Sequence, residues 1–357
     1  MVSRWFEQWE WRLVAAAAAL SLMGALAMVS AASTLNPALA SRHAIWIGLG
    51  ILLSLAAAHT NYRQWSAFSV ALYGLSVISL ILVLAIGHTR LGATRWLSVL
   101  GLSLQPSELA KFALVWVLAR YVAGQPSPLP FRSVLVSLVM MGLPALLIFI
   151  QPDLGSASIL VAIWLGIVWA AGVPARVLMG MSALALALLP VGWHVLKEYQ
   201  RDRLLVFLNP HVDPLGAGFS IIQSTIAIGS GQLWGRGWLA GTQNQLNFLP
   251  ERHSDFIFSV IGEEWGFLGC VAVIAALATL LSRLLRVAQA TSDPHGRLLA
   301  VGVFSWVAYQ ACVNMGMVMG ILPVVGVPLP LVSYGGSSML AIWTALGLLL
   351  SVWRLNR

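Results

Sequence analysis

Apolar stretches of roughly 17–25 residues recur along almost the whole chain, and this recurrence restricts the possible fold more than any other feature. Each stretch is long enough to cross about 30 Å of hydrocarbon as an α-helix. Only 9% of the 357 residues are charged, whereas soluble domains carry about 25%. Strict alternation of apolar and polar residues is absent, which argues against a membrane β-barrel. The sequence therefore predicts an all-α polytopic membrane protein without a soluble domain.

We predict about ten transmembrane helices in a single integral membrane domain that spans residues 1–357. A large extracytoplasmic loop of about 196–253 is expected between helices 7 and 8, with short helices at the membrane interface. The first stretch imitates a signal peptide, but it is long for one and many spans follow, so we expect it to be retained. The predicted spans are approximately 13–33, 43–60, 65–87, 107–123, 132–150, 155–171, 175–195, 254–283, 298–320 and 335–353.

Basic residues set the expected orientation, because cytoplasmic loops are enriched in Arg and Lys. Placing the N-terminus in the cytoplasm leaves only Arg42, Arg90 and Arg95 in the short outside loops. The C-terminus is then also cytoplasmic, and every unusual polar cluster faces outward. The net charge of +8 is scattered between spans, which does not indicate nucleic-acid binding. The cytoplasmic side receives Arg4, Arg12, Arg63, Arg120, Arg132, Arg176, Arg283, Arg286, Arg297, Arg354 and Arg357.

The strongest functional signal is a cluster of ionisable residues at the mouth of an apolar span. Glu251, Arg252, His253 and Asp255 fall within five positions and immediately precede Phe256. Ionisable groups at a membrane boundary cost free energy, which makes them candidate functional residues. Asp255 could accept a proton from a hydroxyl as a general base. The alternative is a helix cap, which is the commoner role of an Asp near a helix start.

Further candidates lie in the other outward-facing segments. Glu108 and Lys111 share one helix face at i, i+3 and form either a structural ion pair or part of the site. Asp153 and Ser337 lie at breaks in the apolar pattern. Such breaks either line a cavity or form tight turns that pack two helices together. Four arginines could bind phosphate bidentately or contact lipid headgroups, namely Arg90, Arg95, Arg201 and Arg203.

Two adjacent carboxylates lie deeper in the span that follows Asp255. From helix periodicity, Glu263 could line the same cavity as Asp255, whereas Glu264 lies on the opposite face and is expected to form structural hydrogen bonds. The sequence shows no set of metal ligands, although a divalent cation held by carboxylates and substrate phosphates is compatible with it.

Over nearly its full length the chain resembles the SEDS family (shape, elongation, division and sporulation), and within it the RodA branch. The glutamate–arginine–histidine sequence around Arg252 favours that branch over the FtsW branch. The resemblance rests on ordered motifs that include Gly92-Ala93-Thr94-Arg95-Trp96, Gln105-Pro106-Ser107-Glu108, Gln151-Pro152-Asp153-Leu154-Gly155, Phe248-Leu249-Pro250-Glu251-Arg252-His253-Ser254-Asp255 and Ser333-Tyr334-Gly335-Gly336-Ser337-Ser338.

This resemblance implies a peptidoglycan glycosyltransferase of the bacterial inner membrane that polymerises lipid II during cell elongation. It implies that Asp255 is the essential residue, and that Glu108, Lys111, Asp153, Ser337, the four arginines, Arg252 and His253 surround the substrate. It also implies a class B penicillin-binding protein as the transpeptidase partner, in contact with membrane lipids.

Two other functions fit the same pattern. A lipid II flippase also needs a charged cavity, but its polar groups should reach both leaflets, and here they concentrate on one side. A non-catalytic scaffold for the penicillin-binding protein would leave Asp255 replaceable.

Overall fold

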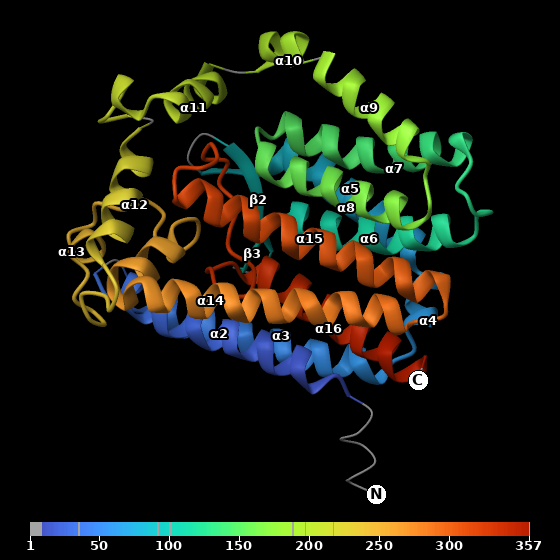
Figure 1. Cartoon of the computed structure of the whole chain (residues 1–357), viewed down its shortest axis with the longest axis horizontal. Helices are drawn as coiled ribbons and strands as arrows, with labels where there is room; N and C mark the ends of the chain where they lie inside the picture. Colours follow the sequence, from blue (N-terminus) through green and yellow to red (C-terminus); the bar gives the residue numbers. More distant parts are fainter. Residues whose placement is uncertain are drawn as a thin grey trace, which may run out of the picture.

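In the computed structural model, which describes residues 9–34, 36–90, 93–99, 102–187, 189–196, 198–216 and 218–356, long helices form one bundle (Figure 1). Helix α2 (Trp11–Ala32) packs against α14 (Ile257–Ala290), and α3 (Ala38–His59) packs against α16 (Gly336–Leu355). The other long helices are α5 (Ser69–Ile86), α6 (Pro106–Ala123), α7 (Phe131–Ile150), α8 (Leu154–Ala170) and α15 (Pro294–Val318), and the short α4 (Tyr62–Ala67) precedes α5.

Seven helices of the described residues are long and apolar enough to cross a membrane, namely α2, α3, α5, α7, α14, α15 and α16. The prediction of a polytopic helical membrane protein is thus confirmed in outline. Helix α8 is apolar but shorter, and α6 carries the charged residues Glu108, Lys111 and Arg120. The predicted span 175–195 contains two helices, α9 (Ala175–Ala187) and α10 (Leu189–Val195), which point in different directions (Figure 1), so the structure does not show it as one straight span.

Small residues allow the helices to approach closely, as is usual where lipid removes the hydrophobic driving force between helices. A side chain at Gly347 of α16 would collide with the backbone of Ser54 in α3. A side chain at Gly24 of α2 would collide with the backbone of Val332, which precedes α16. Both contacts bring backbone against backbone and fix α2 and α3 to the C-terminal part of the bundle.

A small antiparallel sheet connects α5 to α6, and the all-α prediction did not include it. Its strands are β1 (His88–Arg90), β2 (Ala93–Val99) and β3 (Leu102–Leu104), in the order β1-β2-β3. Strand β2 pairs with both neighbours, with Thr94 opposite Thr89 and Leu97 opposite Leu104. Two of the strands have only three residues, which is too short to produce a recognisable alternation in the sequence.

The described residues of the segment 196–253 form short helices, as predicted, and their place at the membrane interface stays a prediction. The segment contains α11 (Glu198–Leu208), the 3-10 turn η1 (Pro210–Val212), α12 (Phe219–Ser230) and α13 (Thr242–Gln245). We call residues 231–247, between α12 and the turn that precedes α14, the inserted loop. This loop packs against a break in α14 at Gly266, where φ is 68° and ψ is −161°.

The inserted loop supplies hydrogen bonds that the broken helix lacks. The amides of Arg236 and Gly237 donate to the carbonyls of Glu263 (2.9 Å) and Glu264 (3.1 Å). In return, the amide of Phe267 donates to the carbonyl of Gln232 at 2.8 Å. Irregular backbone at membrane depth is tolerated where other protein covers it in this way.

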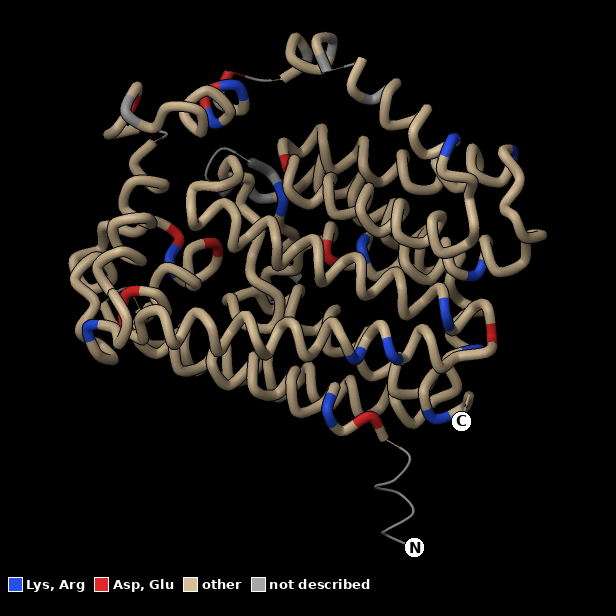
Figure 2. Tube along the Cα trace, viewed as in Figure 1, with Lys and Arg blue, Asp and Glu red and all other residues tan. Residues whose placement is uncertain are grey.

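Charged residues are distributed unevenly along the bundle. Figure 2 shows Lys and Arg gathered at the end that contains the C-terminus. The opposite end, which we call the Asp255 end, contains the turn before α14, the inserted loop and the turn between α7 and α8. The candidate residues that the sequence singled out lie mainly in this half of the molecule.

Candidate functional site

Asp255 lies in a tight turn, residues 251–256, that leads into α14. Glu251, which has a φ of 45°, starts the turn. Its carbonyl accepts hydrogen bonds from the amides of Ser254 (3.1 Å) and Asp255 (3.0 Å). From α15, the side-chain amide of Asn314 donates to the carbonyl of Asp255 at 2.8 Å. The backbone of Asp255 is therefore held on both sides, and its carboxyl group is half-buried.

The surroundings of Asp255 favour the protonated form of its carboxyl group. Burial raises its pKa from 3.8 to about 6, and the nearby charge of Glu251 adds to this effect. The Ser254 hydroxyl and the Arg203 guanidinium oppose the increase in pKa. A carboxylate with a pKa near 6 is largely ionised at neutral pH and is more basic than an ordinary Asp. This is the property expected of a general base that accepts a proton from a hydroxyl.

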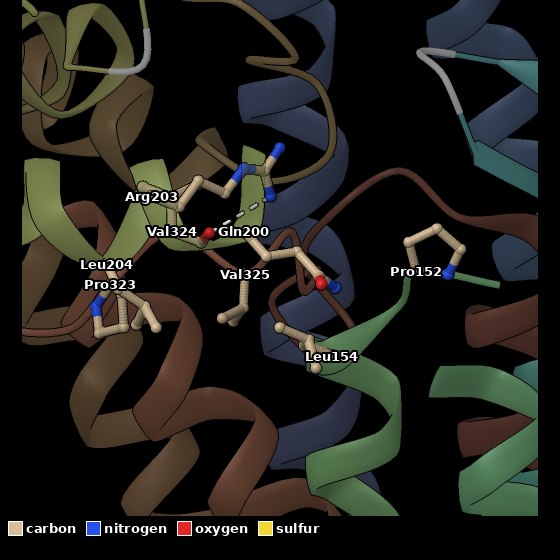
Figure 3. A pocket seen from close by; sticks show the side chains of 8 residues that line it. All are labelled: Pro152, Leu154, Gln200, Arg203, Leu204, Pro323, Val324 and Val325. Atoms are coloured by element: carbon tan, nitrogen blue, oxygen red, sulfur yellow. Dashed lines mark hydrogen bonds between the residues drawn. The ribbon is translucent and has the colours of Figure 1, made fainter. Parts of the chain in front are cut away.

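A groove lies between α11, the start of α8 and the 323–325 segment (Figure 3). Helix α11 contributes Gln200 and Arg203, and the Nη1 of Arg203 donates to the carbonyl of Val324 at 3.3 Å. The opposite wall is the 323–325 segment and the start of α8. The next residue, Gly326, faces Asp255, since a Cβ added there would lie 3.2 Å from the carboxylate Oδ2. The lining residues are Pro152, Leu154, Gln200, Arg203, Leu204, Pro323, Val324 and Val325.

Arg95 and Asp153, both predicted to contact substrate, lie together at the turn between α7 and α8. The Nη1 of Arg95 is 3.8 Å from the Oδ1 of Asp153, and its Nε donates to the carbonyl of Gln151 at 3.3 Å. Asp153 Oδ1 also accepts the amide of Ser156 at 3.1 Å and so caps α8. These contacts tie β2 to the turn that carries Pro152, a residue of the groove wall.

Glu108 and Lys111 form a fully buried ion pair within α6, on the side that packs against α15. The Nζ of Lys111 donates to the Oε1 of Glu108 at 2.7 Å and to the Oε1 of Gln310 at 3.2 Å. The ammonium group also lies 5.5 Å from the ring centre of Trp306. Glu108 Oε2 is buried and has no hydrogen-bond partner within the described part of the chain. A buried acceptor without a donor is unusual, and it leaves this carboxylate able to bind a further hydrogen-bond donor.

The remaining predicted site residues have different surroundings. His253 Nε2 lies 3.7 Å from Glu251 Oε2, and burial lowers the pKa of His253, which favours the neutral imidazole. Ser337 Oγ accepts the amide of Gln105 at 3.0 Å. Arg201 donates to the carbonyl of His194 at 3.0 Å. The side chain of Arg90 lies outside the described residues.

Arg252 and the two glutamates of α14 face the inserted loop. Arg252 is 1% exposed and donates to the carbonyls of Ala31 (2.9 Å) and Asn244 (2.6 Å). Glu263 accepts the amides of Gln243 (2.8 Å) and Asn244 (3.1 Å), so it does not line the cavity of Asp255 as predicted. Glu264 accepts hydrogen bonds from Ser30 and Asn244, which agrees with its predicted structural role.

Sequence reasoning missed Asn314, Gly326 and Gln200. Asn314 and Gln310 lie one helical turn apart inside an apolar span, and two buried amides in such a span are themselves a signal of function. Gly326 carries no such signal in the sequence. Within the described residues, no group of three or more His, Cys, Asp or Glu side chains could hold a metal ion. Binding of a divalent cation therefore stays a prediction.

Comparisons with a family model and with individual known proteins assign this chain to the same family. The family model FTSW_RODA_SPOVE, described as a cell cycle protein, matches residues 10–357. The chain is 41% identical over 307 residues to the peptidoglycan glycosyltransferase MrdB of Escherichia coli, covering 86% of this chain and 83% of MrdB. Seventy-eight known proteins match this chain significantly.

Two solved structures have the same fold. One is a chain from a study of the structural coordination of polymerization and crosslinking by a peptidoglycan synthase complex. It has a TM-score of 0.84 and 37% identity, and the match covers 98% of both chains. The other is the rod shape determining protein RodA of Thermus thermophilus, with a TM-score of 0.73, 31% identity and 97% of both chains covered.

Proposed function

Because this chain belongs to the FtsW/RodA/SpoVE family, we propose that it is a peptidoglycan glycosyltransferase that polymerises lipid II, with Asp255 as its general base. The observation that carries the proposal is the half-buried Asp255 carboxyl, whose pKa of about 6 suits proton transfer at neutral pH. Arg203, which lines the nearby groove and interacts with the charge of Asp255, would add positive charge for a phosphorylated substrate.

In the proposed reaction, the carboxylate of Asp255 removes the proton from the 4-hydroxyl of the acceptor GlcNAc. The resulting oxygen attacks C1 of the donor MurNAc, while the bond from C1 to the pyrophosphate oxygen breaks. Undecaprenyl pyrophosphate leaves, and the single displacement inverts the configuration at C1. Arg203 is placed to bind the departing pyrophosphate, since a guanidinium binds phosphate oxygens bidentately.

The other polar residues support this site. Arg95 and Asp153 hold the wall of the groove, and the buried Glu108–Lys111 pair fixes α6 against α15 beside Asn314. A divalent cation held by carboxylates and the substrate phosphates would supply further charge neutralisation at the leaving group. Its ligands from this chain would be carboxylate oxygens, the donors that Mg²⁺ prefers.

We further propose ten spans in one membrane domain, made by the seven candidate helices together with α6, α8 and the α9–α10 segment. The basic end of the bundle then faces the cytoplasm of the bacterial inner membrane, and both termini lie there. The Asp255 end faces outward, with the loop of about 196–253 between the seventh and eighth spans. A class B penicillin-binding protein would join it as transpeptidase, since one matched structure concerns coordinated polymerization and crosslinking.

The test is glycan polymerisation by the purified protein in detergent with its penicillin-binding partner. Wild type, Asp255→Ala and the control Asp202→Ala, which removes an exposed carboxylate from α11, would each receive lipid II. We expect polymer from wild type and the control, and none from folded Asp255→Ala. Polymer from Asp255→Ala would refute the general base, whereas no polymer from wild type beside an active control polymerase would favour a flippase.

A further inference from the structure

Arg252 is a buried cation that no carboxylate pairs with among the described residues. Its side chain is 1% exposed, and its hydrogen bonds go to neutral oxygens. A buried guanidinium costs free energy unless its N–H groups are satisfied. The burial of Arg252 therefore indicates a structural role that offsets this cost, and its hydrogen-bond partners indicate which role that is.

The guanidinium of Arg252 binds the end of α2. Nε donates to the carbonyl of Ala31 at 2.9 Å, and Nη2 donates to the hydroxyl of Thr34. The C-terminal end of a helix carries partial negative charge and unsatisfied carbonyls, so a cation is stabilised there. The third contact is from Nη1 to the carbonyl of Asn244 in α13, at 2.6 Å.

Asn244 extends these contacts into the core. It is fully buried, and its side-chain amide donates to Ser30 Oγ and to Glu264 Oε1, both at 2.9 Å. Arg252, Asn244, Ser30 and Glu264 thus link α2, the inserted loop and α14 in one hydrogen-bonded network. Such a network resists displacement more strongly than any one of its bonds.

The turn that carries Asp255 is fixed to this network through Arg252, three residues earlier in the chain. Two other anchors hold the same turn. Asn314 binds the carbonyl of Asp255, and the amide of Tyr334 donates to the carbonyl of His253 at 2.9 Å. The three anchors come from different helices and loops, so together they determine where the carboxyl group of Asp255 points.

We propose that Arg252 is a positioning residue for Asp255, holding the turn 251–256 in its reactive geometry by binding the end of α2 and the inserted loop. The inference rests on the proposed role of Asp255 as general base. This role differs from a substrate contact, because the hydrogen bonds of the Arg252 guanidinium go to protein oxygens, on Ala31, Asn244 and Thr34. Misplacing a reacting group by about 1 Å can lower the rate about 100-fold, even when the change lies outside the reacting atoms.

The first test compares Arg252→Lys with the control Arg354→Lys in steady-state lipid II polymerisation. Both changes keep the charge and remove a guanidinium that binds the carbonyl at the end of a helix, since Arg354 Nη2 donates to His59 at the end of α3. We expect kcat to fall about 10- to 100-fold for Arg252→Lys with KM little changed. The control should keep the kcat of wild type.

The pH profile separates positioning from simple loss of folded protein. A loosened turn exposes Asp255 to water, which lowers its raised pKa and moves the acidic limb of kcat toward lower pH. Partial unfolding would scale the whole profile and leave the limb in place. An unshifted limb, or a rise in KM with unchanged kcat, would overturn the proposal and indicate a substrate contact.

Thr34→Val provides a second variant in case Arg252→Lys does not fold. It removes one acceptor of the guanidinium and nearly keeps the side-chain volume. We expect a smaller fall in kcat, and no further fall when it is combined with Arg252→Lys, because both changes remove the same hydrogen bond. Fully additive effects would contradict the network. Asp255→Asn, run in parallel, tests the proposed function itself: if it stays active the base assignment fails, whatever Arg252 does.

Discussion

Replacing Asp255 by Asn should abolish polymerisation and stabilise the folded protein. The folded-state pKa of Asp255 is raised from 3.8 to about 6, chiefly by burial. Between these two values the folded state binds more protons than the unfolded state, so the stability of wild type falls as the pH rises. Asparagine cannot ionise, so the Asn variant does not lose stability in this way as the pH rises. The stabilising effect should therefore be largest above pH 6 and nearly absent below pH 4.

The magnitude follows from the shift of the pKa. At about 1.36 kcal/mol per pKa unit, the free energy of unfolding of the Asn variant should exceed that of wild type by about 3 kcal/mol at pH 7.5 and by about 1 kcal/mol at pH 4.5. Solvent screening of a half-buried carboxyl makes both figures upper values. Thermal unfolding of wild type and variant in detergent at the two pH values measures the difference, with Asp202→Asn as the exposed control. An Asn variant no more stable than wild type at pH 7.5 would refute the raised pKa.

Three further changes test the electrostatics and the packing. Glu251→Gln removes a negative charge that raises the pKa of Asp255, so the acidic limb of the rate profile should move to lower pH, whereas Arg203→Gln should move it to higher pH. Lys111→Met leaves a buried carboxylate unpaired and should lower the free energy of unfolding by about 3–5 kcal/mol, measured by denaturant unfolding in detergent. Gly235→Ala places a side chain at a φ of 83° against the backbone of α14 and should cost at least about 1–2 kcal/mol in the same assay.

Most of the fold could be predicted from the sequence because hydropathy is a local property. The spans and the cluster around Asp255 are visible in short windows, and the structure places them as expected in outline. The role of Arg252 and the hydrogen-bond partners of Glu264 could not be found in this way, because those partners lie 221 and 234 positions away. The β1–β3 sheet escaped prediction because its strands are too short to show a pattern.

Glu263 illustrates a different kind of error. Its predicted position assumed a regular helix, and the angle around that helix was consistent with a cavity. This angle gives no information about a separate loop that supplies hydrogen-bond donors. In the structure, the amides of Gln243 and Asn244 in α13 donate to the Glu263 carboxylate. Arg201 and Arg203 were grouped by proximity in sequence, and in the structure they bind the carbonyls of different segments, His194 and Val324. Substrate binding by Arg201 stays a prediction.

The break in α14 at Gly266 has a consequence for the order in which the protein enters the membrane. Carbonyls and amides released at the break would cost several kcal/mol each if left in hydrocarbon. Their partners, Gln232, Arg236 and Gly237, precede α14 in the chain, so the ribosome delivers them first. The inserted loop is therefore synthesised before α14 and can form these hydrogen bonds as α14 enters the membrane. Moving this loop to the C-terminal side of α14 by circular permutation would leave the helix without its partners during insertion.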